Sequence, residues 1–492
     1  MTSRPLRLGH EAATELREHL DAAAASAGLD TEYPAAALAE ATAAVASYAA
    51  PATDLTHLPF VTIDPEGSTD LDQALWLQAE DDGVRVHYAI ADVPGFVAQG
   101  GELDAETHHR GETAYLPHRR LPLHPEVISE DAGSLLPGQV RGAYVWEILV
   151  GADGGSELVS LTRATVTSRE QLSYPQAQER LEAGNELMVT LHRLGELRRA
   201  DESRRGGADL RLPEQEVELS EHGKLQLSTR TPLPIEEDNA QVSLLTGICA
   251  ARLMLQGGVG LLRTMPPPEQ EALDRFRAVA HALGHPWEGS LSYGEYLRTL
   301  DASRPRQLAI LHAAASLFRG AAYTPFSGQA PEQTEQAAVG APYAHTTAPL
   351  RRLVDRFALV VCHALAEGQA PPAEVVAALE QLPEAMRAAG SAVGTAERAC
   401  VDIIEAALLE QHVGSDFDAV VVDGPVPSPD APPVKALPDA DAKAPAGSVK
   451  VALVEPPVQA KAAGSAPAGS RVRVRVDAVD VPAGKISLSL ID

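Results

Sequence analysis

The sequence predicts an α+β protein with a large mixed body, a small helical module before it and an all-β unit after it. Two Ala-rich amphipathic stretches, 9–27 and 34–49, predict helices. From Leu58 onward, strand-like runs such as FVTID and VRVHYAIADV alternate with helical segments. Near the end, FDAVVVDG and RVRVRVDAVD predict strands again.

The N-terminal module spans residues 1–55. The segment GLDTEYP separates its two helices, and Pro51 with the polar run after it ends the unit. Two interpretations are open for this module. It could be a helix-turn-helix that contacts nucleic acid, or a cap that packs on the next domain, and we favour the cap.

The body spans residues 56–411. EVELSEHGKLQLSTR predicts a hairpin around His222-Gly223. Two helices, SYPQAQERLEAG and NELMVTLHRLGELRRADESRR, precede this hairpin. The further predicted helices are 236–256, 268–284, 306–318, 348–366, 373–389 and 392–411.

The C-terminal unit spans residues 412–492. Its strands FDAVVVDG and RVRVRVDAVD enclose the stretch 423–470, which is rich in Pro, Ala, Asp and Lys. Such a composition is typical of flexible or irregular connections. We therefore expect a β-barrel that carries a long Pro/Ala-rich insertion at 423–470.

Composition excludes several classes of protein. No run of about 18 apolar residues is present, which argues against a membrane-spanning helix. The first 20 residues lack the apolar core of a signal peptide. The three cysteines, Cys249, Cys362 and Cys400, show no CxxC spacing, which argues against a zinc site and a disulfide framework. We expect a cytoplasmic monomer that does not bind membranes.

The net charge of −28 argues, taken alone, against a nucleic-acid binder. It does not exclude one, because a local basic channel and bound metal ions can offset an acidic exterior. Nearly all the basic residues are Arg, and Lys224 is the only lysine before residue 435.

The sharpest local motif is the acidic loop FVTIDPEGSTDLDQALWL, residues 60–77. A strand ends at Asp64, a turn follows, and Asp70 and Asp72 stand at i and i+2. Carboxylates this close favour a cation that neutralises them, and oxygen ligands suit Mg²⁺. The spacing alone leaves two interpretations open, a hard-cation site and a solvated acidic turn.

Ordered motifs along residues 58–410 resemble the catalytic domain of the ribonuclease II and ribonuclease R family. FVTIDPEGSTDLDQAL is similar to the family's signature, and residues 87–138 are similar to the stretch that follows it. SREQLSYPQAQ, ADLRLPE, NAQVSLLTGICAARLM and HTTAPLRRLVDR follow in the family's order. RVRVRVDAVDVPAGKISLSL resembles the last strands of the family's small OB-fold RNA-binding domain.

The resemblance implies a Mg²⁺-dependent 3′-to-5′ exoribonuclease that processively hydrolyses single-stranded RNA to nucleoside 5′-monophosphates. Arg351 would clamp a phosphate, Tyr115 would stack on the terminal base and Tyr174 would lie near the cleavage site. The implied catalytic residues are Asp64, Asp70, Asp72 and Arg351. The implied metal ligands are Asp64, Asp70, Asp72 and Gln73. The implied RNA contacts are Tyr115, Tyr174, Arg352 and Gln241.

The sequence departs from the family pattern at several places. Gln73 stands where the family has a second adjacent Asp, and Ala348 where it has Ser. Residues 239–241 lack the usual acids, and an aliphatic residue near Leu210 replaces a second stacking aromatic. An alternative is therefore a catalytically impaired member that binds RNA or regulates. The net charge motivates a third hypothesis, a hydrolase of smaller phosphate esters.

Overall fold

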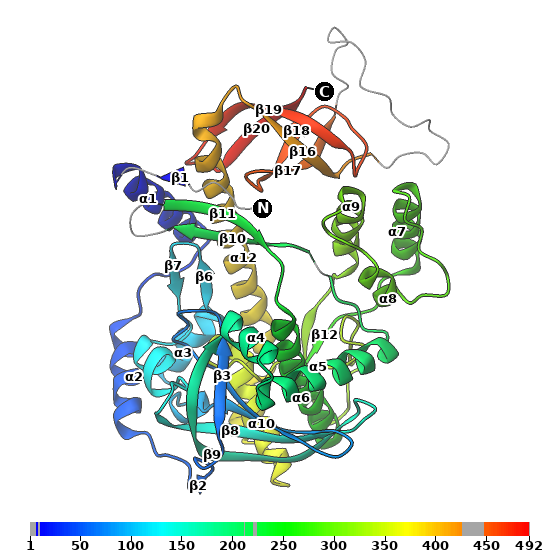
Figure 1. Ribbon diagram of the computed structural model, residues 1–492. Coiled ribbons are helices and arrows are strands. Elements are labelled where there is room, and N and C mark those ends of the chain that lie inside the picture. Colours follow the sequence, from blue (N-terminus) through cyan, green and yellow to red (C-terminus); the bar gives the residue numbers. More distant parts are fainter. Residues whose placement is uncertain (1–5, 8–9, 211, 220–223, 426–446, 492) are drawn as a thin grey trace.

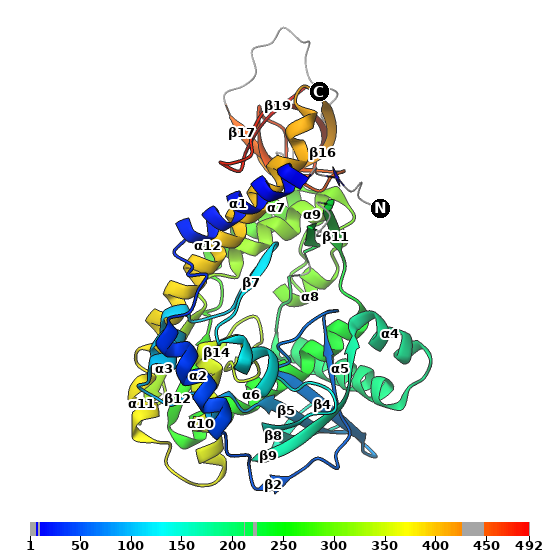
Figure 2. The same ribbon diagram turned by 90° about the vertical axis from the view of Figure 1, so that its left-hand side faces the viewer.

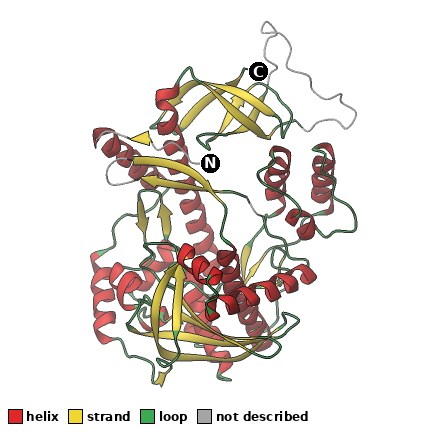
Figure 3. Cartoon of the chain, in the orientation of Figure 1, coloured by secondary structure: helices red, strands yellow, loops and turns green. Residues whose placement is uncertain are grey.

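The structure is a computed structural model, and it describes residues 6–7, 10–210, 212–219, 224–425 and 447–491. A mixed body carries a β-barrel above it, and helix α12 (Leu382–Leu409) runs from the body to the barrel (Figure 1). The chain contains both helices and strands, with a mixed sheet in the body and an all-β barrel, which confirms the predicted α+β class (Figure 3).

The centre of the body is a six-stranded sheet with the order β2-β9-β3-β4-β5-β8, in which β8 also pairs with β9. Strand β3 lies between β9, to which it is parallel, and β4, to which it is antiparallel. The strands predicted at FVTID and VRVHYAIADV are confirmed as β3 and β5. The strand bounds are β2 (Thr53–Asp54), β3 (Phe60–Asp64), β4 (Gln73–Ala79), β5 (Val84–Ala91), β8 (Val140–Val150) and β9 (Ser156–Ser173).

Helices cover both faces of this sheet. Leucines of α5 and α6, together with Leu353 and Phe357 of α10, pack on the Ile and Val side chains of one face. Ala41 of α2 and Leu103 of α3 close the other face. The helices are α2 (Ala35–Ser47), α3 (Glu102–Arg110), α4 (Tyr174–Glu182), α5 (Glu186–Arg205), α6 (Pro234–Gly257), α10 (Leu353–Ala366) and α11 (Ala373–Ala378).

Hairpins and a helical subdomain extend the body. The predicted hairpin is present, although its turn at 220–223 lies outside the described residues. The paired strands are β6 (Ala114–Leu116) with β7 (Arg119–Leu121), β10 (Glu214–Leu219) with β11 (Lys224–Arg230), β12 (Val259–Thr264) with β13 (Ala322–Ser327), and β14 (Glu335–Gln336) with β15 (Ala341–Pro342). The subdomain consists of α7 (Gln270–Ala282), α8 (Tyr293–Arg298) and α9 (Pro305–Ala314).

The two N-terminal helices form at the predicted places, but they pack on different cores. Leu16 and Leu20 of α1 (His10–Ser26) pack against α12, and the two helices lie side by side (Figure 2). Ala41 of α2 instead packs in the core of the body. Each helix therefore buries its apolar face on a different part of the protein. The choice between a packing cap and a helix-turn-helix stays a prediction.

The boundary between α11 and α12 lies at a different place from the predicted one. The sequence predicts helices over 373–389 and 392–411, but α11 ends at Ala378 and α12 runs without a break through Gly390. Pro383 lies in the first turn of α12, where proline favours a helix start. One glycine inside a helix costs roughly 0.5–1 kcal/mol, which the buried face of α12 outweighs.

The C-terminal unit is a closed five-stranded barrel with the order β16-β17-β18-β20-β19, which confirms the predicted OB-fold barrel. The predicted insertion at 423–470 is too long. Strands β17 and β18 lie inside it, because SVKVAL alternates exposed and buried residues as a barrel strand does. Residues 426–446 lie outside the described residues. The barrel strands are β16 (Asp416–Asp423), β17 (Ser448–Leu453), β18 (Gln459–Ala463), β19 (Arg471–Asp480) and β20 (Lys485–Leu490).

Candidate active site

The acidic loop connects the end of β3 to the start of β4. Asp64 is the last residue of β3, and Asp72 directly precedes β4. Because these strands are antiparallel neighbours, the two residues lie at the same end of the sheet. Asp72 is only 4% exposed, and Asp64 is half-buried.

A second segment, residues 345–352, folds against this loop from 278 positions further along the chain. The backbone N–H of Leu350 donates to Asp72 Oδ1 at 2.7 Å. Arg351 Nε lies 3.5 Å from Asp72 Oδ2, and the Arg351 side chain is 44% exposed. Asp72 is thus fixed by the backbone, while the Arg351 guanidinium remains accessible to a ligand.

Arg352 has a different environment from its neighbour. Its Nε and Nη2 donate to the two oxygens of Asp355 at 2.9 and 2.8 Å. Asp355 is fully buried and also accepts from the N–H of Ala348. The guanidinium of Arg352 therefore stabilises the 345–352 segment, and its predicted contact with RNA stays a prediction.

Asp70 is held by the β6–β7 hairpin. Tyr115 Oη donates to Asp70 Oδ2 at 2.6 Å, and Arg120 Nη1 donates to Asp70 Oδ1 at 2.6 Å. Arg120 also contacts Glu130. Tyr115 and Arg120 are cross-strand partners, so their side chains lie on the same face. The sequence analysis missed Arg120, although the two-residue turn in TAYLPHRRL places it opposite Tyr115.

Gln73 is engaged in a buried polar network rather than aimed at the other acids. Its Nε2 donates to the Thr347 carbonyl at 2.6 Å. Its Oε1 accepts from Tyr88 at 2.5 Å and from Ser243 at 3.4 Å. An amide oxygen has two lone pairs, and both are used here. In this arrangement Gln73 is not available as a metal ligand, contrary to the sequence-based expectation.

Burial strongly perturbs two of the carboxyl groups. Desolvation raises the pKa of Asp64 to about 7, and the charge of Asp70 adds to the rise while Arg351 opposes it. Desolvation raises the pKa of Asp72 to about 8 against the opposing effects of Arg351 and the Leu350 N–H. Such shifts mark groups whose negative charge lacks a sufficient counter-charge.

Part of the predicted metal site fits a hard cation. Asp64 Oδ2 is buried without a hydrogen-bond partner in the described part of the chain, and Arg351 compensates the charge of Asp72 only in part. Asp70 is instead neutralised by Arg120. No group of three His, Cys, Asp or Glu side chains within the described ranges is close enough to hold a metal. Of the predicted ligands, Asp64 and Asp72 therefore fit Mg²⁺ best.

A cavity of about 430 Å³ lies beside the site and contains two of the predicted RNA contacts, Tyr174 and Gln241. Tyr174 opens α4 directly after β9. Burial raises the pKa of its phenol, and the nearby Asp64 carboxylate raises it further. Gln241 Nε2 donates to Glu202 at 3.2 Å on the cavity wall.

The raised pKa values predict how stability depends on pH. In the folded protein the pKa is about 7 for Asp64 and about 8 for Asp72, above the ordinary value of 3.8. At a pH between the ordinary and the raised pKa values, unfolding therefore releases protons. In chelator, the free energy of unfolding should therefore fall as the pH rises from about 4 to about 8. Melting temperatures should decline less steeply with pH in the Asp64→Asn/Asp72→Asn variant. Equal pH slopes in the variant and the wild type would contradict this.

Comparison with known proteins identifies the family of this chain. The RNB domain model matches residues 52–367, and the RNase II-type exonuclease C-terminal S1 domain model matches residues 415–491. The chain therefore belongs to the RNB family, and the resemblance to ribonucleases II and R is confirmed.

Particular relatives show how far the similarity extends. Exoribonuclease 2 of Aeromonas hydrophila is 31% identical over 236 residues, which are 46% of this chain and 35% of that protein. Ribonuclease R of Aquifex aeolicus is 24% identical over 397 residues, 75% of this chain and 54% of that protein. The chain thus spans about a third to a half of the length of these relatives.

Solved structures share the fold at low identity. Mycoplasma genitalium RNase R in complex with ribose-methylated single-stranded RNA superposes with a TM-score of 0.82 and 20% identity, covering 97% of this chain and 78% of that one. Yeast Ssd1, described as a pseudonuclease, superposes with a TM-score of 0.61 and 14% identity, covering 86% of this chain and 52% of that one.

No described helix is long and apolar enough to cross a membrane.

Proposed function

We propose that this protein is a 3′-to-5′ exoribonuclease that hydrolyses single-stranded RNA, processively, to nucleoside 5′-monophosphates. The observation that carries the proposal is the meeting of Asp72 with Arg351 across 3.5 Å, beside the buried Asp64. A guanidinium next to carboxylates in a low-dielectric site can bind a phosphate and stabilise charge that develops on it.

The residues around Asp72 and Arg351 are suited to bind the terminal nucleotide of an RNA strand. Tyr115 is 46% exposed, so its ring offers a surface on which a base can stack. The cavity with Tyr174 and Gln241 has room for a nucleoside. Contacts with 2′-hydroxyl groups would distinguish RNA from DNA.

The proposal includes a magnesium ion held by Asp64 and Asp72. A bound Mg²⁺ would stabilise negative charge on the phosphate. The chain's own residues contribute in other ways. Arg351 orients the phosphate, the Leu350 N–H keeps Asp72 in position, and Arg120 with Tyr115 holds Asp70 at the edge of the site. The monomeric state and the cytoplasmic location stay predictions from the sequence.

A second candidate function is an RNA-binding protein without catalysis. The observation that favours it is Gln73, whose amide hydrogen-bonds the Thr347 carbonyl and the Tyr88 hydroxyl where the family pattern has an acid. The shared fold does not decide between the candidates, because one fold supports both active and inactive members.

The test is a time course on 5′-labelled unstructured RNA with Mg²⁺ and with chelator. We expect full-length RNA to be replaced by a short label-bearing core only with Mg²⁺, with few products of intermediate length because the degradation is processive, together with release of nucleoside 5′-monophosphates. Intact RNA that the protein nevertheless binds would overturn the nuclease proposal in favour of the second candidate. Release of the label as the first product would overturn the proposed direction.

A further inference from the structure

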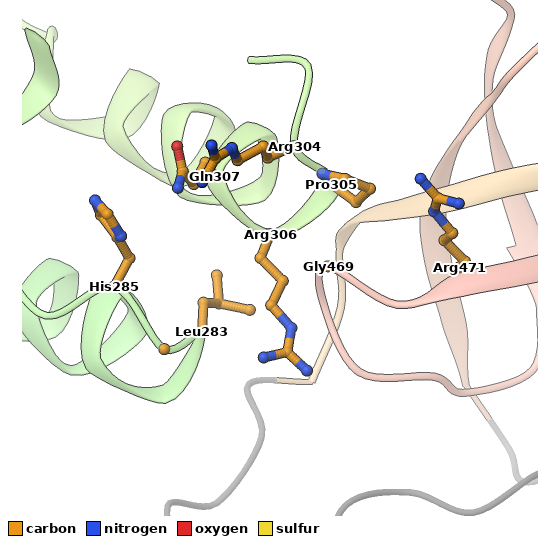
Figure 4. A pocket seen from close by; sticks show the side chains of 9 residues that line it. Leu283, His285, Arg304, Pro305, Arg306, Gln307, Gly469 and Arg471 are labelled. Atoms are coloured by element: carbon orange, nitrogen blue, oxygen red, sulfur yellow. The ribbon is translucent and has the colours of Figure 1, made fainter. Parts of the chain in front are cut away.

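A second cavity of about 430 Å³ lies between the helical subdomain and the barrel, away from the acidic loop. Arg304 directly before α9 and Arg306 within it line this cavity, together with Arg471 of the barrel and His285 of the loop after α7. Figure 4 shows Arg306 projecting from α9 beside Gly469, with Arg471 on the barrel side. Three arginines from the helical subdomain and the barrel thus line one hollow.

The charge of this cavity is unusual for this chain. The protein has a net charge of −28, yet no acidic side chain is among the described residues that line the cavity. Arg304 pairs with the exposed Asp301 at 3.2 Å. For Arg306 and Arg471, the described ranges contain no ion-pair partner. Among the residues that the structure describes, two of the three cations therefore have no counter-charge in an ion pair.

The neighbouring arginines of the same strand provide a contrast. Arg471, Arg473 and Arg475 alternate along β19 and are all exposed. Asp416 accepts from Arg475 at 2.8 and 3.2 Å and from Arg473 at 3.4 Å. Asp416 thus pairs with the two arginines outside the cavity, whereas Arg471 at its edge has no such partner among the described residues and is available to an external anion.

The cavity is also held in shape by packing. Ala468 of the barrel is buried in the core of the helical subdomain with Leu283 and Ala280. Gly469 has a φ of +75°, and a Cβ there would lie 3.0 Å from the Arg306 Cα. The glycine therefore lets the barrel approach α9 closely. A cavity whose walls are packed together binds with a smaller entropic cost than a mobile surface.

We propose that this cavity holds a phosphate group of the RNA strand, at a point separate from the cleavage site. The proposal rests on the proposed function, because it assumes that RNA is the substrate. Guanidinium forks bind phosphate oxygens in a bidentate manner. The cavity also includes the start of α9, where Pro305 has no N–H but the next residues of the first turn have N–H groups that favour an anion. A phosphate held here would anchor a strand too long to be contained in the active site.

The test measures binding of a 5′-fluorescent, unstructured 20-nucleotide RNA by anisotropy, in chelator and over a series of salt concentrations. Arg306→Gln/Arg471→Gln should weaken binding by about 10-fold or more and reduce the slope of log affinity against log salt by about 0.7 per lost contact. Arg473→Gln/Arg475→Gln is the matched control, because it removes the same charge from the same face, and it should change affinity less than about 3-fold.

Single neutral methylphosphonate linkages, moved along the RNA, locate the contact. One position should weaken wild-type binding and leave the Arg306→Gln/Arg471→Gln variant unchanged. Arg306→Lys/Arg471→Lys should keep most of the salt slope, which separates loss of charge from loss of folding. Binding of adenosine monophosphate and of inorganic phosphate, measured by calorimetry, tests whether the anion is a free phosphate compound.

The possible results are distinguishable. Equal affinity and salt slope in the cavity variant and the matched control would overturn the proposal, while RNA binding by the wild type would leave the proposed function standing. A cavity variant that changes only the binding of adenosine monophosphate or inorganic phosphate would also overturn it, since the site would then serve a free ligand. A wild type that binds no RNA would overturn both proposals.

Discussion

Asp72→Asn should reduce the rate of RNA hydrolysis by about 1000-fold or more, within the range observed when a central electrostatic or proton-transfer group is removed. Asparagine preserves the size of the side chain and an oxygen that can accept from the Leu350 N–H. It removes the negative charge that faces Arg351 and that fits a cation. The measurement is the initial rate of mononucleotide release with Mg²⁺.

The same substitution should not destabilise the protein. Because burial raises the pKa of Asp72 to about 8, the folded metal-free protein disfavours the charged carboxylate at neutral pH, and a neutral amide avoids that cost. The melting temperature in chelator should therefore be unchanged or higher. Asp82→Asn, in the exposed turn between β4 and β5, is the matched control and should leave the rate unchanged. Wild-type rates in Asp72→Asn would refute the assigned role.

Sequence reasoning located the acidic loop because its residues are local in the chain. A strand that ends at Asp64 and the i, i+2 spacing of Asp70 and Asp72 are visible in one short motif. What each carboxylate contacts depends on distant segments. Arg120 of the β6–β7 hairpin contacts Asp70. The 345–352 segment, which lies near the C-terminal end of the body in the sequence, contacts Asp72. Only the tertiary fold brings these together.

Gln73 shows most clearly where prediction from the sequence fails. Because Gln73 follows Asp72 directly in the sequence, both are predicted to bind the same metal ion. The backbone alternates there, so adjacent side chains point to opposite sides, and Gln73 meets Tyr88 and Ser243 instead. In the barrel, composition suggested a long insertion, whereas the alternating pattern of SVKVAL correctly indicates strand β17. Periodicity was the better guide than composition at that place.

The adjacent residues Arg351 and Arg352 should respond to the same substitution in opposite ways. Arg351→Gln should lower the rate of RNA hydrolysis by about 100-fold or more, the range for losing a group that stabilises transition-state charge. The Arg351 side chain is 44% exposed, and its one ion-pair contact within the described ranges, with Asp72, is 3.5 Å long. Little folding stability therefore depends on it. The midpoint of urea unfolding should hardly change.

Arg352→Gln should give the opposite result. Its removal leaves Asp355 buried without its bidentate partner, and breaking such a pair typically costs about 3–5 kcal/mol. The midpoint of urea unfolding should therefore shift to a lower urea concentration. Any residual activity at low temperature should retain the wild-type dependence on RNA concentration. If Arg351→Gln instead destabilised the fold while Arg352→Gln remained stable and inactive, the assignment of the two guanidinium groups would be reversed. The phosphate-binding role would then belong to Arg352.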